Sequence, residues 1–381
     1  MSWQTAADTR LANGLRIVVL SADATPVVES RLVLIATGGL DAGDLIRRLD
    51  VTAARTVPGL TVTAESVGDL PLVLASSVPD RFEDVARAFA GILAGHPHRP
   101  ASPGRARTEG HRRGFWRDVL SRRLTGRSAG PAEGPRTAHI RPRPSLLIVA
   151  GPIDAATAIR AAGRHLGTVP ADVVPIARPR SRVHRPAPPQ IVGDPEAEYA
   201  TMLATAPAPY PGDQDFAAVL MAAELVGGGS QARLHRALGR RYPGVVNATC
   251  TVEHDATGAW LALRIDVTGA RADLLADAAL HALGTAVRRP PTAAEWATAK
   301  AGVFQTTVAA QAGTAQTATS CARAAAYGLP PAFWLSVPRQ LHHLGASEVA
   351  AAARRYLAPE HFTTAVPGLT SRLHPCEGKR R

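Results

Sequence analysis

The chain is poor in lysine, in aromatic residues and in cysteine. Among its 43 basic residues only Lys300 and Lys379 are lysines, and aromatic residues make up 4% of the 381 positions. The three cysteines, Cys250, Cys321 and Cys376, lie far apart and show no metal-binding spacing. A sparse, odd set of thiols argues against a disulfide framework and is typical of a reducing compartment, so we expect a cytoplasmic protein.

Long apolar runs are also missing. No stretch of about 18 apolar residues occurs, so the sequence predicts no membrane-spanning helix. The segment from Met1 to Gly14 lacks the basic start and apolar core of a signal peptide, and export is not expected. Because 46% of the residues are hydrophobic, a chain of this length can bury two ordinary domain cores.

The net charge of +12 raises the question of a nucleic-acid partner. The densest basic stretch, Arg99 to Arg143, contains only two aromatic residues, Phe115 and Trp116. It therefore lacks the stacking surface that single-strand binders use. The excess of arginine over lysine, with abundant Ala, Gly and Pro, is typical of a GC-rich genome. We favour a solvated basic face or a surface for an acidic partner over specific nucleic-acid binding.

Hydrophobic periodicity predicts strands and helices in both halves of the chain. Strands are expected at residues 11–20, 27–37, 60–78 (two strands), 145–151, 199–206, from 245, 258–267 and 361–366. Helices are expected at residues 41–55, from 82 to 93, 107–124, 154–166, from 216, from 230, 272–287, 292–327 and from 347. This order predicts an α+β fold of two similar domains, each a mostly antiparallel sheet with helices packed on one side. The expected boundaries are 1–176, a Pro/Arg-rich linker at 177–190, and 191–381.

One stretch, from Phe216 to Asp255, says most about the function of the chain. It reads FAAVLMAAELVGGGSQARLHRALGRRYPGVVNATCTVEHD. An apolar helix ends on three glycines, Ser230 is expected to cap an amphipathic helix, and Gly244 turns the chain into a strand. This order resembles the second-domain core of the insulinase-like (pitrilysin) metallopeptidases. The phrase Leu-Ala-Asn-Gly-Leu-Arg at residues 11–16, with its following strand, is similar to the opening of the same family.

The metal motif of that family is missing. Members that cut peptides carry H-x-x-E-H on a first-domain helix, completed by a distant Glu. The corresponding segment here, LDAGDLIRRLDVTAART at residues 40–56, has no histidine, and none of the 13 histidines belongs to such a motif. Glu109 matches the distant ligand, but a lone carboxylate does not hold zinc. We therefore predict no metal, no cofactor and no catalytic residue in this chain, with zinc only in a partner subunit.

The resemblance also implies two substrate-binding positions. In the family, an Arg and a Tyr seven residues apart point from the second domain into a shared chamber and bind the substrate backbone. Aligned on Gly244, this sequence has Arg240 and Asn247 there, and the Asn departs from the family pattern. Aligned on Leu238, Gly239 takes the Arg position instead. A solvent-facing arginine and a strand-start asparagine are the alternative interpretation.

The three glycines, Gly227, Gly228 and Gly229, allow two interpretations. They form a tight helix–helix connection, which we favour, because glycine tolerates sharp turns. Alternatively they touch substrate, as the resemblance to the non-catalytic subunit of the mitochondrial processing peptidases implies. Arg233 and Arg236 lie within two helical turns and would then add charge for an acidic peptide.

Taken together, the resemblance implies a peptidase-like subunit that holds peptide without cutting it. We expect the non-catalytic, substrate-binding half of a heterodimeric insulinase-like zinc peptidase, with a zinc-bearing partner of the same family and a peptide substrate. A structural scaffold with the same fold is the first alternative. An arginine-rich nucleic-acid-binding protein is the second, and it requires the stretch from Arg99 to Arg143 to form one basic surface.

Overall fold

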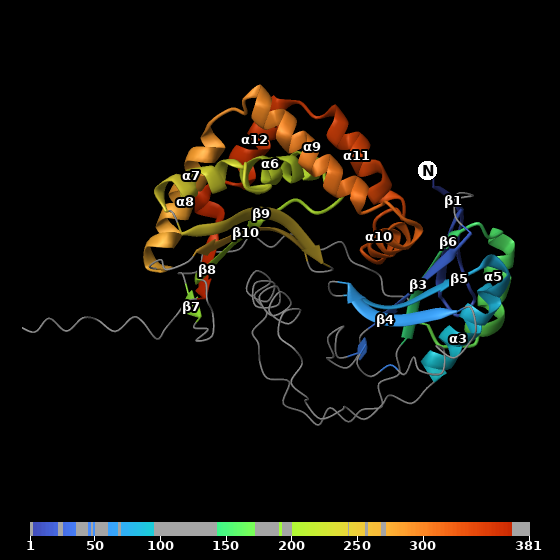
Figure 1. The fold of residues 1–381 in the computed structure, drawn as a ribbon. Coiled ribbons are helices and arrows are strands. Elements are labelled where there is room, and N and C mark those ends of the chain that lie inside the picture. Colours follow the sequence, from blue (N-terminus) through green and yellow to red (C-terminus); the bar gives the residue numbers. More distant parts are fainter. Residues whose placement is uncertain are drawn as a thin grey trace, which may run out of the picture. The chain divides into compact units, whose positions relative to one another are not determined.

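In the computed structural model the chain divides into two units (Figure 1). The structure describes residues 3–21, 26–35, 45–46, 49, 60–67, 70–94, 143–171, 190–192, 200–242, 244–255, 258–267 and 272–367. Unit 1 is assigned Met1–Trp116, Ala129–Arg178 and Thr307–Ser336. Unit 2 is assigned Arg117–Ser128, Pro179–Thr306 and Val337–Arg381. Unit 1 therefore includes a segment from late in the chain.

Unit 1 contains a six-stranded sheet with the order β1-β2-β6-β3-β5-β4. Its strands are β1 (Gln4–Arg10), β2 (Arg16–Ser21), β3 (Val28–Ile35), β4 (Thr61–Val67), β5 (Leu70–Ser77) and β6 (Arg143–Gly151). Only β2 and β6 pair in parallel, and the other pairs are antiparallel. Strand β6 enters the middle of the sheet although it is the last of the six in sequence.

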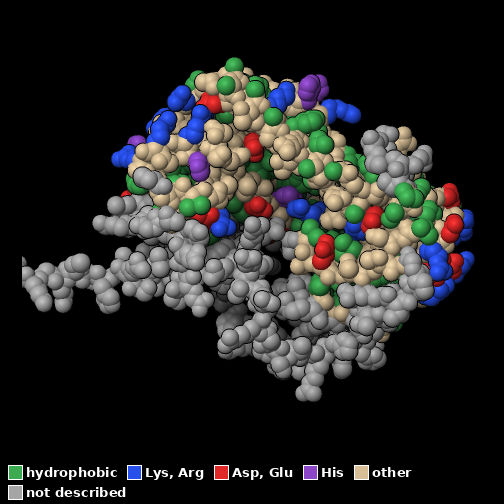
Figure 2. All heavy atoms as spheres, viewed as in Figure 1, with side chains coloured by type: hydrophobic (Ala, Val, Ile, Leu, Met, Phe, Trp, Pro, Cys, Tyr) green, Lys and Arg blue, Asp and Glu red, His purple; other side chains and the backbone are tan. Residues whose placement is uncertain are grey.

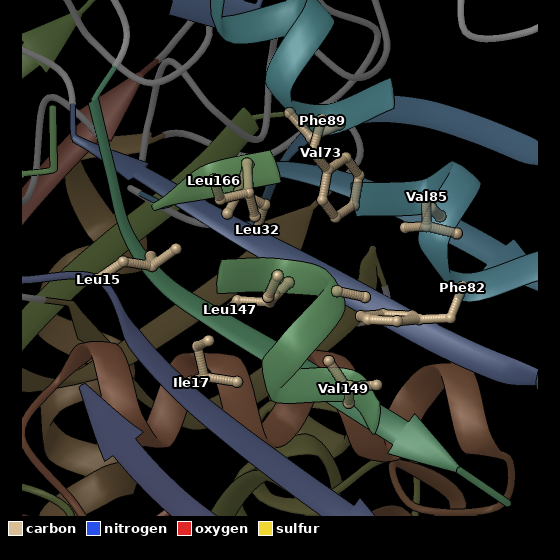
Figure 3. Packing of buried hydrophobic residues seen from close by; sticks show 14 of the residues in the cluster. Leu15, Ile17, Leu32, Val73, Phe82, Val85, Phe89, Leu147, Val149 and Leu166 are labelled. Carbon is tan, nitrogen blue, oxygen red and sulfur yellow. The ribbon is translucent and has the colours of Figure 1, made fainter. Parts of the chain in front are cut away.

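One face of this sheet forms a hydrophobic core with two helices, α3 (Phe82–Ala94) and α5 (Ala155–Leu166). Figure 3 labels the main contributors, which are Leu15, Ile17, Leu32, Val73, Phe82, Val85, Phe89, Leu147, Val149 and Leu166. All ten are at most 2% exposed. Helix α5 begins as the sequence predicts, because the Asp154 carboxylate accepts a hydrogen bond from the Thr157 amide at 2.8 Å.

The opposite face of the same sheet is covered by α10 (Thr314–Ala326), which contacts β3 and β6. A charged residue, Arg31 of β3, is buried in this contact, with 3% of its surface exposed. Its guanidinium donates to Thr319 Oγ1 at 2.9 Å and to the Ala315 carbonyl at 3.0 Å, and it pairs with Glu29 at 2.9 Å. Helices thus lie on both faces of this sheet, not on one face alone.

Unit 2 contains a five-stranded sheet with the order β7-β11-β8-β10-β9. Its strands are β7 (Gln190–Val192), β8 (Ala200–Pro207), β9 (Val245–Asp255), β10 (Gly258–Val267) and β11 (Thr363–Pro367). Only β7 and β11 pair in parallel. The longest strand, β9, is the last in the order, so one of its edges has no further named strand beside it.

The helices of unit 2 pack around one buried helix, α6 (Phe216–Gly227). Residues on every side of α6 are buried, since it contacts both β9 and α12 (Ala346–Tyr356). The helices α7 (Arg233–Arg241) and α8 (Ala272–Arg288) pack on each other. The residues of α9 (Ala293–Ala309) and α11 (Phe333–His343) are divided between the two units. Short 3₁₀ helices lie at Pro79–Arg81 in unit 1 and at Pro359–His361 in unit 2.

The predicted α+β class with mostly antiparallel sheets is confirmed, but several local predictions are wrong. The helix expected at residues 292–327 is two helices, because the chain turns at Gln311 and Ala312 before α10 starts after Gly313. Ser230 is not a cap, since α7 begins at Arg233 without a side-chain cap. Strand β1 was not predicted at all, because its sequence is mainly polar.

Some predictions fall on residues that the structure does not describe. Almost all of the linker at 177–190, the helix at 107–124 and the basic stretch before Arg143 lie outside the described residues. The domain boundaries therefore stay a prediction. Among the helices that the structure describes, none is long and apolar enough to cross a membrane.

Candidate functional site

The glycine loop, Gly227–Gly229, joins α6 to α7 beside strand β9. A side chain on Gly227 would overlap the backbone of Cys250 in β9. Helix and strand therefore approach each other at a distance that only glycine permits. This contact fixes the loop on the last strand of the sheet.

The next two glycines continue along the same strand. Gly228 forms an isolated antiparallel bridge with Thr249 of β9. Gly229 has a φ angle of 131°, a conformation that residues with side chains rarely adopt. This geometry supports the tight connection that the sequence favours. A substrate contact by the same glycines stays a prediction.

Adding one methyl group at Gly227 tests this contact. We expect Gly227→Ala to destabilise the protein by about 1–3 kcal/mol, because the methyl group forces β9 away from α6. Gly239→Ala is the control, since a Cβ there meets nothing within 4 Å. It should stabilise α7 by about 0.5–1 kcal/mol, because alanine is the better helix former. Thermal unfolding measures both, and similar shifts for the two variants would contradict the close approach.

Arg233, which the sequence suggested as a contact for an acidic peptide, is buried at 8% exposure. Its guanidinium donates to the carbonyls of Ala286 (2.7 Å), Arg289 (2.6 Å) and Pro290 (2.8 Å) and to the Glu295 carboxylate (2.7 Å). These carbonyls lie at the end of α8, where a helix leaves its last acceptors unpaired. Arg233 therefore has a structural role between α7, α8 and α9.

Glu295 forms ion pairs with both Arg233 and Arg236. Arg236 donates to its second oxygen at 2.8 Å, and Thr292 exchanges hydrogen bonds with Glu295 at the start of α9. The hydrogen bond from Arg233 is the main reason that the pKa of Glu295 falls to about 2. Arg233 and Arg236, which the sequence suggested as contacts for an acidic peptide, are thus paired with Glu295.

Asn247, the second position implied by the family pattern, lies near the start of β9. Its side-chain amide donates to Asp266 of β10 at 3.2 Å, and Asp266 also accepts from Arg264 at 3.0 Å. Asn247 is two residues from Thr249, the bridge partner of Gly228. The glycine loop therefore contacts the same strand, β9, that carries Asn247. Its amide is engaged by a neighbouring strand.

Arg240 lies in the last turn of α7 and is exposed. Among the described residues it has no hydrogen-bond or ion-pair partner. Its neighbour Arg241 is also exposed, and Figure 2 shows Lys and Arg side chains gathered over the end of unit 2 that carries α7 and α8. Basic residues in the last turn of a helix complement its dipole, which is a sufficient structural reason for both. The structure shows no contact between Arg240 and Asn247.

The described residues do not fit a family zinc centre. They contain no group of three or more His, Cys, Asp or Glu side chains that could hold a metal ion. Within residues 40–56 only Leu45, Ile46 and Leu49 are described, and Glu109 is not. His254 is buried in β9, with its ring edge-on to Tyr210. We assign no metal-dependent step to this chain.

One charged residue of the site escaped the sequence analysis. Glu224 lies one helical turn before Gly228, in the last turn of α6, and is half-buried. Its carboxylate fills the space that side chains on Gly228 and on Gly302 of α9 would occupy. Burial raises its pKa above the ordinary value. A lone acid in an otherwise apolar helix beside three glycines was the signal in the sequence.

Residues 136–303 match a family model described as the peptidase M16 inactive domain. Over these residues the chain is similar to the M16, or insulinase-like, peptidase family. The match spans β6 and α5 of unit 1 and continues in unit 2 through the glycine loop, Arg240 and Asn247 as far as α9. No curated protein matches the chain in sequence.

Several solved structures share this fold. A peptidase M16 inactive domain from Pseudomonas fluorescens is 16% identical, with a TM-score of 0.73 over 97% of this chain and 98% of that one. A protease from Helicobacter pylori is 13% identical, with a TM-score of 0.69 over 96% and 99%. A chain of Complex III2 from Candida albicans is 13% identical, with a TM-score of 0.70 over 97% of each. At such identities the likeness shows the fold.

Proposed function

We propose that this M16 protein is a non-catalytic, peptide-binding subunit that acts together with a zinc-bearing partner of the same family. The observation that carries the proposal is the inactive-domain match at residues 136–303 in a chain without H-x-x-E-H. Two histidines and a glutamate on one helix are what such enzymes need to hold zinc and activate water. Without them, the chemistry that the fold supports best is the binding of an extended peptide.

Strand β9 is the surface on which we place the peptide. It is the last strand of its sheet, and among the described residues the isolated bridge from Gly228 is the only pairing on its outer edge. A sheet edge offers backbone N–H and C=O groups, to which an extended peptide adds as a further strand. At Thr249 the outer edge of β9 is already paired with Gly228, so the peptide would pair with the part of the strand next to Gly228.

Arg240 supplies the charged contact in this proposal. Its guanidinium is exposed, and among the described residues nothing pairs with it. In the assembled peptidase it would donate to a substrate carbonyl or to the developing oxyanion, as the family pattern implies. Asn247 contributes less, because its amide is bonded to Asp266. The chain itself needs no cofactor in this proposal, and we place the complex in the cytoplasm.

Co-purification and assay of the pair test the proposal. The tagged full chain is purified from its native host, and any M16 subunit that copurifies and carries H-x-x-E-H is isolated. We expect no stoichiometric zinc and no peptide hydrolysis from this chain alone, and a rise in the partner's hydrolysis rate when the chain is added. About one tightly bound zinc per chain, or a partner whose rate is unchanged, would contradict it.

Arg240→Ala in the assembled pair tests the residue itself. Losing one charge-assisted donor to the transition state costs about 2–4 kcal/mol, or roughly a 30- to 1,000-fold loss of turnover. Arg241→Ala is the matched control, because it removes the same charge from the adjacent exposed position. A loss within about twofold for Arg240→Ala, or an equal loss for both variants, means that Arg240 is only a surface arginine.

A structural scaffold remains the second candidate. The similarity to a chain of Complex III2 from Candida albicans is the observation that favours it. A scaffold would associate with its partners and leave peptide binding and hydrolysis unchanged. The same co-purification and assay therefore distinguish the two functions.

A further inference from the structure

We propose that Glu224 recognises a positively charged group on the peptide bound beside the glycine loop, either a Lys or Arg side chain or the free N-terminal ammonium. This inference rests on the proposed peptide-binding function and gives it a substrate preference. The preference is opposite in sign to the acidic peptide that the sequence suggested.

The position of the carboxylate is the first argument. Glu224 contacts Gly228, the residue whose backbone bridges to Thr249 on the outer edge of β9. Gly228 is exposed, and the residues that follow, Gly229, Ser230 and Gln231, carry no charge. A peptide lying along this edge would therefore meet Glu224 as the charged side chain that touches the loop.

The state of the carboxylate is the second argument. Among the described residues no hydrogen bond or ion pair reaches Glu224, although it is half-buried and lacks much of its contact with water. It also lies in the last turn of a helix, where the dipole disfavours a negative charge. A carboxylate that is desolvated and unpaired gains most from a cationic donor, because such hydrogen bonds are the strong ones.

Gly302 makes room for this arrangement. It lies in the interior of α9, where a glycine is less favourable than alanine for helix stability. A Cβ at this position would overlap the Glu224 carboxylate. A glycine at residue 302 therefore lowers the helix propensity of α9 but leaves space for the Glu224 carboxylate, which lies between Gly228 and Gly302.

The nearby arginines do not compete for the carboxylate. Arg233 and Arg236 both donate to Glu295, and Arg233 also donates to the end of α8. Both guanidinium groups are paired with the Glu295 carboxylate. The site that the structure leaves for a ligand beside the loop is therefore an acceptor of positive charge.

Fluorescent peptides provide the test. The probes share one neutral, β-forming ten-residue sequence labelled at the C-terminus. The first peptide has an acetylated N-terminus and no charge, and the second differs from it by one central lysine. In the third peptide that lysine is acetylated, and the fourth is the first peptide with a free N-terminus. Fluorescence anisotropy measures binding to the purified full chain, to Glu224→Gln, and to Glu360→Gln, which removes an exposed acid elsewhere. Glu224→Gln keeps the shape of the side chain, so folding should be unaffected.

We expect the lysine peptide or the free-amine peptide to bind about tenfold more tightly than its neutral counterpart, and Glu224→Gln to abolish that difference. Whichever of the two shows the effect identifies the source of the charge. Glu360→Gln should behave like the natural chain. If all four peptides bind equally and Glu224→Gln changes nothing, the charge preference is wrong while peptide binding stands. If no peptide binds, both the inference and the proposed function fail.

Discussion

Arg233→Ala is expected to destabilise unit 2 by about 3–5 kcal/mol, since removing one partner of a buried ion pair leaves the other without compensation. The guanidinium is 8% exposed and is the shared donor for three carbonyls at the end of α8 and for Glu295 at the start of α9. Alanine leaves all of these acceptors without that donor. For a unit of this size the loss lowers the unfolding temperature by about 10 °C.

Arg236→Ala is the matched control for this result. Arg236 pairs with the same carboxylate, but 44% of its side chain is exposed. Exposed pairs contribute at most about 1 kcal/mol. Calorimetry that resolves the transitions of the two units should therefore show a large shift for Arg233→Ala and a small one for Arg236→Ala. Equal shifts would mean that burial of Arg233 contributes nothing to stability.

The acid range gives a second measurement on the same pair. The pKa of Glu295 is lowered from 4.5 to about 2 in the folded chain, chiefly by the hydrogen bond from Arg233. A depressed carboxyl pKa stabilises the fold above the unfolded pKa, and this contribution is lost as the pH falls from about 4.5 toward 2. The difference in stability between the natural chain and Arg233→Ala should therefore shrink across that pH window.

Arg31→Met is expected to destabilise unit 1 by about 3–5 kcal/mol for the same physical reason in a different place. Arg31 and Glu29 lie on the face of the sheet that α10 covers, with side chains 3% and 10% exposed. Arg31 connects β3 to Thr319 and to the Ala315 carbonyl of α10, and Glu29 accepts from Ser76 of β5. Methionine fills the volume but leaves the Glu29 charge buried, with only the Ser76 hydroxyl as a donor among the described residues.

Two further variants separate charge from packing at this site. Glu29→Leu combined with Arg31→Met removes both charges, so it should recover most of the stability that Arg31→Met loses. Arg16→Ala is the less buried control, since the side chains of Arg16 and its partner Asp8 are 24% and 37% exposed, and it should cost less than about 1 kcal/mol. A double variant as unstable as Arg31→Met would show that the hydrogen bonds of Arg31 to α10, and not the unpaired charge, decide the loss.

The strands and the glycine loop could be predicted because their signals are local. Alternation of apolar residues placed β4, β5 and β10 within a residue or two, and Asp154 marked the start of α5. Three adjacent glycines after an apolar helix indicated a close connection, and the contact of Gly227 with Cys250 supplies the reason. The resemblance to the M16 family followed from the same stretch, since its pattern is a run of neighbouring residues.

The partners of the charged side chains could not be predicted in this way. Arg233 and Glu295 are 62 residues apart, and Arg31 and Thr319 are 288 residues apart. An arginine on an amphipathic helix has the same sequence pattern whether water or a helix end receives its hydrogen bonds. For this reason Arg233 was assigned to a peptide, whereas the structure buries it between helices.

The sequence alone determined the class of fold, the family resemblance and the missing metal motif, because each depends on residue types at short, fixed spacings. Only the tertiary structure decided which charges remain available at the glycine loop. Folding brings Arg233 and Arg236 to Glu295, and it leaves Glu224 between two glycines without a partner among the described residues. The physical reason is that burial and pairing are set by contacts between distant segments, and these contacts determine the sign of the charge that a ligand meets.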